Sequence, residues 1–285
     1  MAHTEFQRSV CRLIAHNRVA SGESYIADGA ALNTLIGATR ISRDIDLFHD
    51  TAEAVASTWD SDRTLLESQG YRVQAQRMRE SFVEAVVSMG GRSVVMQRAP
   101  DSAFRFFPLI EHEDFGLTLH PFDLATNKVL ALVGRLEVRD WVDVIHCHGR
   151  IQRLGCQAWA ASGKDPGFSP PAILEQAGRS ARYSAAEIDA LSYSGEPPDA
   201  GELSRAWHSM LEEAGSIVAE LPPAEVGKGV LDEKGRLFAG DPAVACLPVP
   251  PLSRRPDSRC PAKPARAVTP HSAPCHARPC MDTDS

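Results

Sequence analysis

The chain has 285 residues, 43% of them hydrophobic and 24% charged, and its formal net charge is −7 at pH 7. This composition is typical of a globular protein of one or two domains. The acidic balance excludes a strongly basic nucleic-acid-binding protein, and no apolar run reaches the roughly 18 residues of a membrane span. The seven cysteines include no C-x-x-C pair, which favours free thiols, so we expect a cytoplasmic protein without membrane association.

The first part of the chain alternates between helical and strand patterns, judged by the spacing of its hydrophobic residues. Helices are predicted over residues 4–19, 30–36 and 51–69, and strands over 25–27, 44–48, 71–75, 81–89 and 92–98. Gly90-Gly91 between the last two strands indicates a hairpin. Mixed elements in this order predict an α+β domain, with flanking helices on a mixed sheet, over residues 1–118.

The second part is helical and the third has no hydrophobic period. Helices are predicted over residues 121–134, 138–148, 154–161, 171–179 and 202–220, forming a helical domain over 119–222. The last segment, 223–285, becomes rich in proline towards its end. Such a composition buries too little apolar area to offset the entropy of ordering, so we expect a disordered tail from about residue 223 or 240 onward.

Two acids mark the candidate catalytic strand. Asp44 and Asp46 flank Ile45, and residues two apart in a strand share one face. Two carboxylates on one face repel each other unless a cation lies between them. Mg²⁺, or Mn²⁺ in its place, suits such a pair together with substrate phosphates. Exposed acids at a turn are the alternative explanation.

A strand, a tight turn and a helix precede this acidic pair. Gly29 lies at the turn, where a missing side chain lets the backbone approach a ligand. A phosphate-binding turn followed about fifteen residues later by metal-binding carboxylates is an order that suits nucleotidyl transfer. A simple structural turn would also need a glycine here.

At this point two blocks of the sequence resemble the AbiEii/AbiGii-type nucleotidyltransferases, a toxin branch of the DNA polymerase β-like superfamily. The first block reads G-A-A-L…R-x-S-x-D-x-D-L-F, and the second has a lysine in an apolar helical stretch followed by R-D-x-x-D. The residues that carry the resemblance are Gly29, Arg40, Ser42, Asp44, Asp46, Lys128, Arg135, Arg139, Asp140 and Asp143.

The resemblance implies a polymerase β-like fold and a metal-dependent transfer of a nucleoside monophosphate from an NTP to a hydroxyl group. The acceptor would be an RNA, including tRNA, or a protein. The protein would act as the toxin of a type IV toxin–antitoxin or abortive-infection system, with a cognate antitoxin protein as partner.

Site roles follow residue by residue from the same resemblance. Asp44 and Asp46 would be the catalytic metal ligands, while Gly29 and Lys128 would bind the nucleotide phosphates. Ser42 would bind a phosphate or orient Asp44. For Lys128 a surface position is the alternative.

Three further charged residues have two explanations each. Arg40 or Arg43, on either side of Ser42, could contact phosphate, and Arg40 could instead form a salt bridge to an acid. Asp140 and Asp143, three apart on one helix face, could support the site or pair with Arg135 or Arg139.

Two positions depart from the family pattern. Asp28 stands where family members carry a small residue, and a carboxylate there would repel phosphates. The strand expected to supply a third carboxylate offers Gln97 instead, and Glu84 or Asp101 would have to substitute.

Two other functions therefore remain open from the sequence. A degenerate member of the same fold would bind nucleotide or a partner protein without turnover. A sugar transferase would use the Asp-x-Asp pair around a nucleotide-sugar, although only forty-three residues precede Asp44 to build a nucleotide-binding domain.

Overall fold

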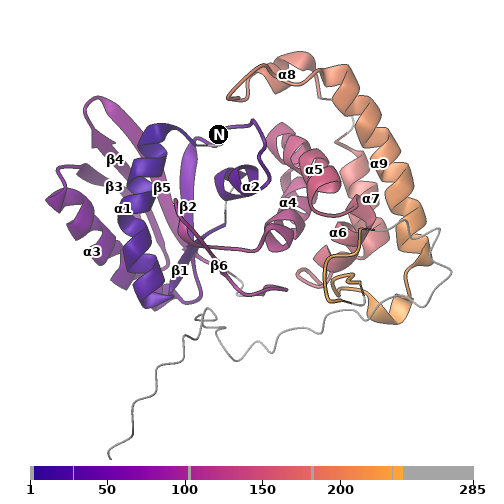
Figure 1. Ribbon diagram of the computed structural model, residues 1–285, viewed down its shortest axis with the longest axis horizontal. Helices are drawn as coiled ribbons and strands as arrows, with labels where there is room; N and C mark the ends of the chain where they lie inside the picture. The colour runs from indigo at the N-terminus through magenta and orange to yellow at the C-terminus, as the bar shows by residue number, and fades with distance from the viewer. Residues whose placement is uncertain (1–2, 28, 102–103, 181–182, 233, 240–285) are drawn as a thin grey trace, which may run out of the picture.

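The computed structural model describes residues 3–27, 29–101, 104–180, 183–232 and 234–239, and Figure 1 shows a sheet with its helices beside a second group of helices. Asp28 lies outside the described residues, as does most of the predicted tail, residues 240–285. The predictions made for them are therefore not addressed by the structure.

Within the described residues the strands form one seven-stranded mixed sheet in the order β3-β4-β5-β2-β1-β7-β6. The strands are β1 (Ser24–Ile26), β2 (Asp44–His49), β3 (Arg72–Arg79), β4 (Phe82–Met89), β5 (Arg92–Pro100), β6 (Ile110–His112) and β7 (Gly116–Thr118). The central strand β2 runs antiparallel to β1 and parallel to β5. This mixed α+β architecture confirms the predicted fold class.

Alternation along β2 decides which side chains reach the candidate site. Ile45 and Leu47 are buried in the hydrophobic core, whereas Asp44 and Asp46 are half-buried on the opposite face. Helices α1 (Glu5–Ser21) and α3 (Ala52–Ser68) pack on the core face of this part of the sheet. The period-two pattern of the sequence thus turns the two carboxylates away from the core.

The remaining helices form the second half of the molecule, except α2 (Gly29–Leu35), which lies between β1 and β2 in the chain. They are α4 (Pro121–Arg135), α5 (Val138–Arg150), α6 (Leu154–Ala161), α7 (Pro170–Gly178), α8 (Ala185–Asp189) and α9 (Ala200–Glu220). Leu124, Ala125 and Cys147 belong to the same core cluster as the sheet residues. The two predicted domains therefore share a core, and the boundary near residue 118 stays a prediction.

Residue 223, the earlier of the two expected starts of the tail, lies in the described part of the structure. Residues 223–232 and 234–239 are part of the structure, beginning with a short 3-10 turn at Pro223–Glu225. Val230 is buried in a cluster with Trp159, and Gln152 Nε2 donates to the carbonyl oxygens of Val230 at 2.9 Å and Phe238 at 3.0 Å. These apolar residues cover α6 and α9, so the segment gains enough burial to be ordered.

Every helix in the described part of the chain is too short or too polar to cross a membrane.

Candidate active site

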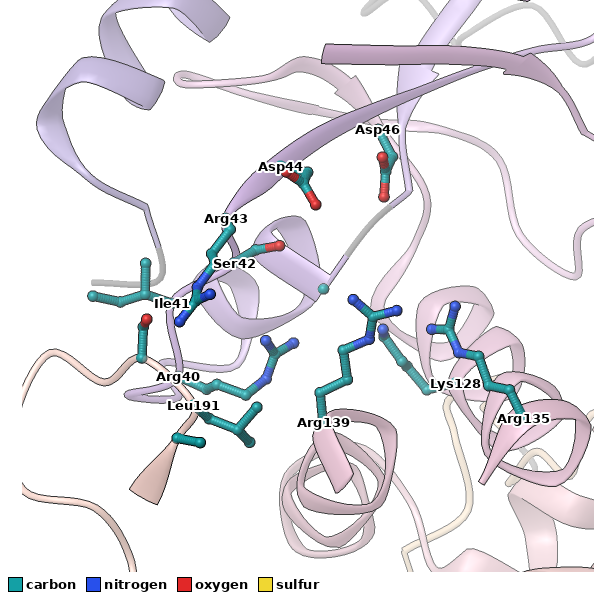
Figure 2. Close-up of a pocket in the computed structure, with 13 residues that line it drawn as sticks. Arg40, Ile41, Ser42, Arg43, Asp44, Asp46, Lys128, Arg135, Arg139 and Leu191 are labelled. Carbon is teal, nitrogen blue, oxygen red and sulfur yellow. The ribbon is translucent and has the colours of Figure 1, made fainter. Parts of the chain in front are cut away.

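A cavity of about 240 Å³ lies between the start of β2, the start of α2 and the turn that joins α4 to α5. Figure 2 shows the two aspartates of β2 on one side and three basic side chains from α4 and α5 on the other. The cavity is lined by Gly29, Arg40, Ile41, Ser42, Arg43, Asp44, Asp46, Lys128, Arg135, Arg139, Ala190, Leu191 and Ser192. All six residues predicted as catalytic or nucleotide-binding are among them.

The carboxylates of Asp44 and Asp46 point into this cavity from the same face of β2 (Figure 2). The charge of Asp46 also acts on Arg135 across the cavity. The pKa of Arg135 is raised above its usual value, mainly by hydrogen bonds to Asp140 and in smaller part by Asp46. The acidic pair therefore faces a cationic wall contributed by the helical half of the molecule.

The backbone at Gly29 comes close to charged side chains of the site. A Cβ atom at this position would lie 2.4 Å from Arg40 Nη2 and 3.4 Å from both Asp143 Oδ2 and Lys128 Nζ. Arg40 is held by two hydrogen bonds and has little freedom to move aside. Gly29 is thus required by close approach of charged side chains to the first residue of α2.

Arg40 and Asp143 explain that close approach. Arg40 Nε and Nη2 donate to the two oxygens of Asp143 at 2.7 and 2.6 Å, and both side chains are buried. Asn33 Nδ2 donates to the same carboxylate at 3.2 Å. Of the two explanations considered for Arg40, the structure shows the salt bridge, although Arg40 also lines the cavity.

Lys128 is enclosed rather than lying on the surface. Its Nζ lies 3.1 Å from Asp140 Oδ1 and 3.3 Å from Asp143 Oδ2, with its side chain 13% exposed and lining the cavity. Asp140 also accepts from Arg135 Nε at 2.6 Å and Nη2 at 2.9 Å. Burial alone would raise the pKa of Asp140, but Arg135 and Lys128 outweigh it and hold this pKa below its usual value.

Asp140 and Asp143 are therefore buried anionic supports. Each pairs with two basic side chains that line the cavity, and neither aspartate lines it itself. Ser42 does line the cavity, while its carbonyl oxygen accepts from Gln7 Nε2 at 3.0 Å, which ties this segment to α1.

Two cavity arginines had no predicted role as ligands of the substrate: Arg135 and Arg139. Arg135 and Arg139 come together because Leu136 adopts a left-handed conformation, with φ of 53°, and ends α4 just before α5 begins. A non-glycine residue with positive φ is uncommon, and the sequence gives little sign of it. The R-x-x-x-R spacing of Arg135 and Arg139 was the sequence signal that could have indicated two cavity arginines at that turn.

The third carboxylate is absent from the position beside Asp46. Gln97 lies opposite Asp46 in the parallel pair β2–β5, and Glu84 lies opposite Gln97 on β4. Gln97 Nε2 donates to Glu84 Oε2 at 3.0 Å. Glu84 is two strands away from Asp46, about 10 Å at the usual strand spacing, so it does not join the acidic pair.

Asp101 is also remote from the cavity. Pro100 lies opposite His49 at the far end of β2, so Asp101 is four residues beyond Gln97, about 13 Å along the strand. Its carboxylate accepts from the Tyr25 hydroxyl at 2.9 Å. Neither Glu84 nor Asp101 therefore substitutes for the missing acid, because the strand register carries both away from Asp46.

No family model matches this sequence, and no curated protein is similar to it. Among solved structures, JHP933 from Helicobacter pylori superposes with a TM-score of 0.52 at 12% identity, covering 76% of this chain and 95% of that one. A second protein, provisionally described as a nucleotidyltransferase from H. pylori, gives 0.50 at 13% identity, covering 76% and 96%. MenT4, a nucleotidyltransferase toxin from Mycobacterium tuberculosis, gives 0.49 at 16% identity, covering 77% and 85%.

These similarities show that the chain has the mixed α+β fold of the H. pylori proteins. At such low identity they establish the fold alone, and an activity has to be argued from the cavity.

Proposed function

We propose that this protein is a nucleotidyltransferase that moves a nucleoside monophosphate from an NTP to a hydroxyl group. The observation that carries the proposal is the single cavity in which Asp44 and Asp46 face Lys128, Arg135 and Arg139. A polyanion with a bound divalent cation complements both walls, because its phosphates suit the basic side chains and its metal suits the carboxylates.

The two aspartates fit a magnesium ion that is shared with a substrate. Mg²⁺ is held by one or two carboxylates plus phosphates and water. Asp44 and Asp46 line the same cavity as Lys128, Arg135 and Arg139, so a metal held by the two carboxylates would take its other ligands from phosphate oxygens and water. When bound there, Mg²⁺ or Mn²⁺ would neutralise phosphate charge and make the α-phosphorus more electrophilic.

The chain's own residues then position the nucleotide. Lys128, Arg135 and Arg139 would neutralise the triphosphate, and Gly29 would let it approach the backbone. In the transfer, the acceptor oxygen bonds to the α-phosphorus, the bond to the bridging oxygen breaks, and pyrophosphate leaves. The acceptor proton passes to water, because Gln97 beside Asp46 cannot act as a general base.

The biological role we propose is that of an AbiEii-type toxin in a type IV toxin–antitoxin or abortive-infection system. The motif residues Gly29, Arg40, Asp44, Asp46 and Lys128 support it, since they meet at one cavity. In this proposal the acceptor is an RNA or a protein, the partner is a cognate antitoxin, and the protein is located in the cytoplasm.

A second candidate function is favoured by one observation. Gln97 occupies the position opposite Asp46 where a third carboxylate would lie, and its amide is bonded to Glu84. A protein with only two acids could bind NTP without turnover. This candidate predicts NTP binding that depends on Lys128 and no transfer.

The test is a transfer assay with Mg²⁺, each α-labelled NTP, and cellular RNA and protein as acceptors. Asp44→Asn and Asp46→Asn keep the side-chain shape and remove the charge, so both should abolish labelling. Glu67→Gln serves as the control, because Glu67 is exposed on α3 and does not line the cavity. NTP binding without labelling would favour the second candidate, and hydrolysis of a nucleotide-sugar would favour a sugar transferase.

A further inference from the structure

One face of the β3–β4–β5 part of the sheet is open. The helix-facing residues Val83, Ala85 and Val87 of β4 are buried, and α3 packs against this part of the sheet. Phe82 and Val86, which point the other way, are only half-buried. The open face is the one that carries Asp44 and Asp46, because opposed residues in a sheet share a face.

A row of polar residues crosses this face from the acidic pair to the edge of the sheet. Asp46 lies opposite Gln97, Gln97 opposite Glu84, and Glu84 opposite Arg77 on the edge strand β3. Glu84 Oε1 lies 3.7 Å from Arg77 Nε. At the usual strand spacing the row is about 14 Å long, which corresponds to about four stacked nucleotides at ~3.4 Å each.

A β-bulge places the edge arginines on this same face. The register of β3 against β4 shifts between Ala75 and Arg77, so that Arg72, Arg77 and Arg79 lie opposite Ser88, Glu84 and Phe82. If Gln76 paired with Glu84 in regular alternation instead of forming the bulge, Arg77 and Arg79 would turn towards α3. Bulges commonly redirect side chains in this way.

The resulting surface is basic in an acidic protein. Strand β3 carries three arginines and no acid, whereas the chain as a whole has a net charge of −7. Within the described residues Arg72 and Arg79 have no ion-pair partner, and the Arg77 side chain is 70% exposed. Charged residues also protect an exposed edge strand from pairing with other chains, but that role does not require them to share one face.

We propose that this open face, defined by Arg72, Gln74, Arg77 and Arg79 with Phe82 beside them, binds the phosphate backbone of a single-stranded nucleic acid. Arginines suit phosphates, and Phe82 offers an aromatic ring for a base. The strand would run from the β3 edge along the polar row and bring its terminal hydroxyl to Asp44 and Asp46. This direction rests on the proposed function; the binding itself does not.

The test measures binding of fluorescent single-stranded RNA and DNA of about 12 nucleotides to the full-length protein. Fluorescence anisotropy is followed between about 50 and 200 mM salt. The test variant is Arg72→Gln/Arg77→Gln/Arg79→Gln. The control is Arg63→Gln/Arg205→Gln/Arg236→Gln, which removes the same charge from exposed positions elsewhere.

The test variant should bind the oligonucleotide at least about tenfold more weakly, and its log–log salt slope should fall by about 2, at ~0.7 per lost phosphate contact on a single strand. The control should stay close to the unmodified protein, and both variants should bind NTP normally because none of these arginines lines the cavity. The RNA and DNA arms show which sugar is accepted.

A second variant tests whether the arginines must lie on the open face of the sheet, while their number stays the same. Arg77→Met/Met78→Arg keeps composition and charge but moves one guanidinium to the other face, where Met78 is 61% exposed and leaves room for it. Its salt slope should fall by about 0.7. Unchanged binding in this variant would mean that the arginines act only as edge protection.

The proposal is overturned if neither oligonucleotide binds the unmodified protein, if the two triple variants weaken binding equally, or if the test variant binds the oligonucleotide as tightly as the unmodified protein. Binding is read without turnover, so the two proposals fail separately. If the test variant loses oligonucleotide binding and the unmodified protein shows no transfer, the binding surface is supported and the transferase activity is rejected. If the test variant transfers label as well as the unmodified protein does, the activity is kept and the binding surface is rejected.

Discussion

Arg40 and Asp143, 103 residues apart in the chain, form a bidentate ion pair in which neither side chain has appreciable contact with solvent. The pair joins the segment before β2 to helix α5, and Lys128 lies 3.3 Å from the same carboxylate. It therefore fixes the basic wall of the cavity relative to the strand that carries the two aspartates.

Breaking this pair should destabilise the protein strongly. Asp143→Asn leaves the Arg40 guanidinium buried without its counter-ion, so the free energy of unfolding should fall by about 3–5 kcal/mol. Urea denaturation measures it. Glu67→Gln, which breaks the exposed pair of Arg63 and Glu67, should cost less than about 1 kcal/mol. Similar losses in the two variants would contradict a structural role for the buried pair.

Gly29 should not tolerate even one methyl group. In Gly29→Ala the new Cβ would meet Arg40 Nη2 at 2.4 Å, and Arg40 is tethered to Asp143. Stability should fall, and NTP affinity measured by calorimetry should fall with it. Gly134→Ala is the matched control, since that helical glycine has open space around it and alanine should stabilise α4 by about 0.5–1 kcal/mol. If both variants behave alike, close approach is not the reason for Gly29.

Arg139 should contribute directly to nucleotide binding. Its side chain comes from α5 and points into the cavity towards Asp44 and Asp46 (Figure 2). Losing one charge-assisted hydrogen bond to phosphate should raise the Kd for NTP about tenfold in Arg139→Gln. Arg153→Gln removes an equal charge from a residue that pairs with Glu213 outside the cavity lining, and it should bind NTP normally. An equal loss in both would indicate a non-specific charge effect.

His49 should make stability depend on pH. Burial, and next the charge of Arg98, lower the pKa of His49 to about 4 from an ordinary value of 6.5. The unfolded chain takes up a proton below pH 6.5, while the folded protein does not until about pH 4. The contribution of His49 is therefore complete above pH 6.5 and is lost as pH falls towards 4, by about 1.4 kcal/mol per pH unit.

Urea denaturation between pH 4 and 7 tests this prediction. The pKa of buried His3 is lowered similarly, to about 4, and burial also lowers the pKa values of His120, His146 and His148, so the slope of the unmodified protein should be steeper than that from His49 alone. His49→Phe should make the free energy of unfolding depend less steeply on pH, because the contribution of this one histidine is removed. An unchanged slope in this variant would show that His49 is protonated in the folded state.

Much of the fold could be predicted because helices and strands leave different hydrophobic periods. The helix over 154–161 and the hairpin at Gly90-Gly91 occur where the sequence predicts them. The strands β6 and β7 and the helix α8 are only three to five residues long, too short to show a period. The sequence does not decide between residues 223 and 240 as the start of the tail, because the few apolar residues after 222 gain their burial from distant helices.

Site residues whose position follows from local sequence pattern could be predicted. Residues whose position depends on the register between strands could not. Asp44 and Asp46 share a face by alternation alone, and Gly29 and Lys128 reach the same cavity from separate elements. The positions of Glu84 and Asp101 depend on how β4, β5 and β2 align, which one sequence does not encode locally. Arg139 reaches the cavity through the left-handed turn at Leu136, which also lacks a local signal.

The central claim is that the nucleotide gives up its α-phosphoryl group with the nucleoside attached. The most direct measurement compares transfer from NTP labelled at the α-phosphate with transfer from the same NTP labelled at the γ-phosphate, while released pyrophosphate is counted. Our account predicts label on the acceptor from the α-position alone, one pyrophosphate per transfer, and loss of both in Asp46→Asn. Label from the γ-position, or nucleotide binding with no transfer from either, would contradict it.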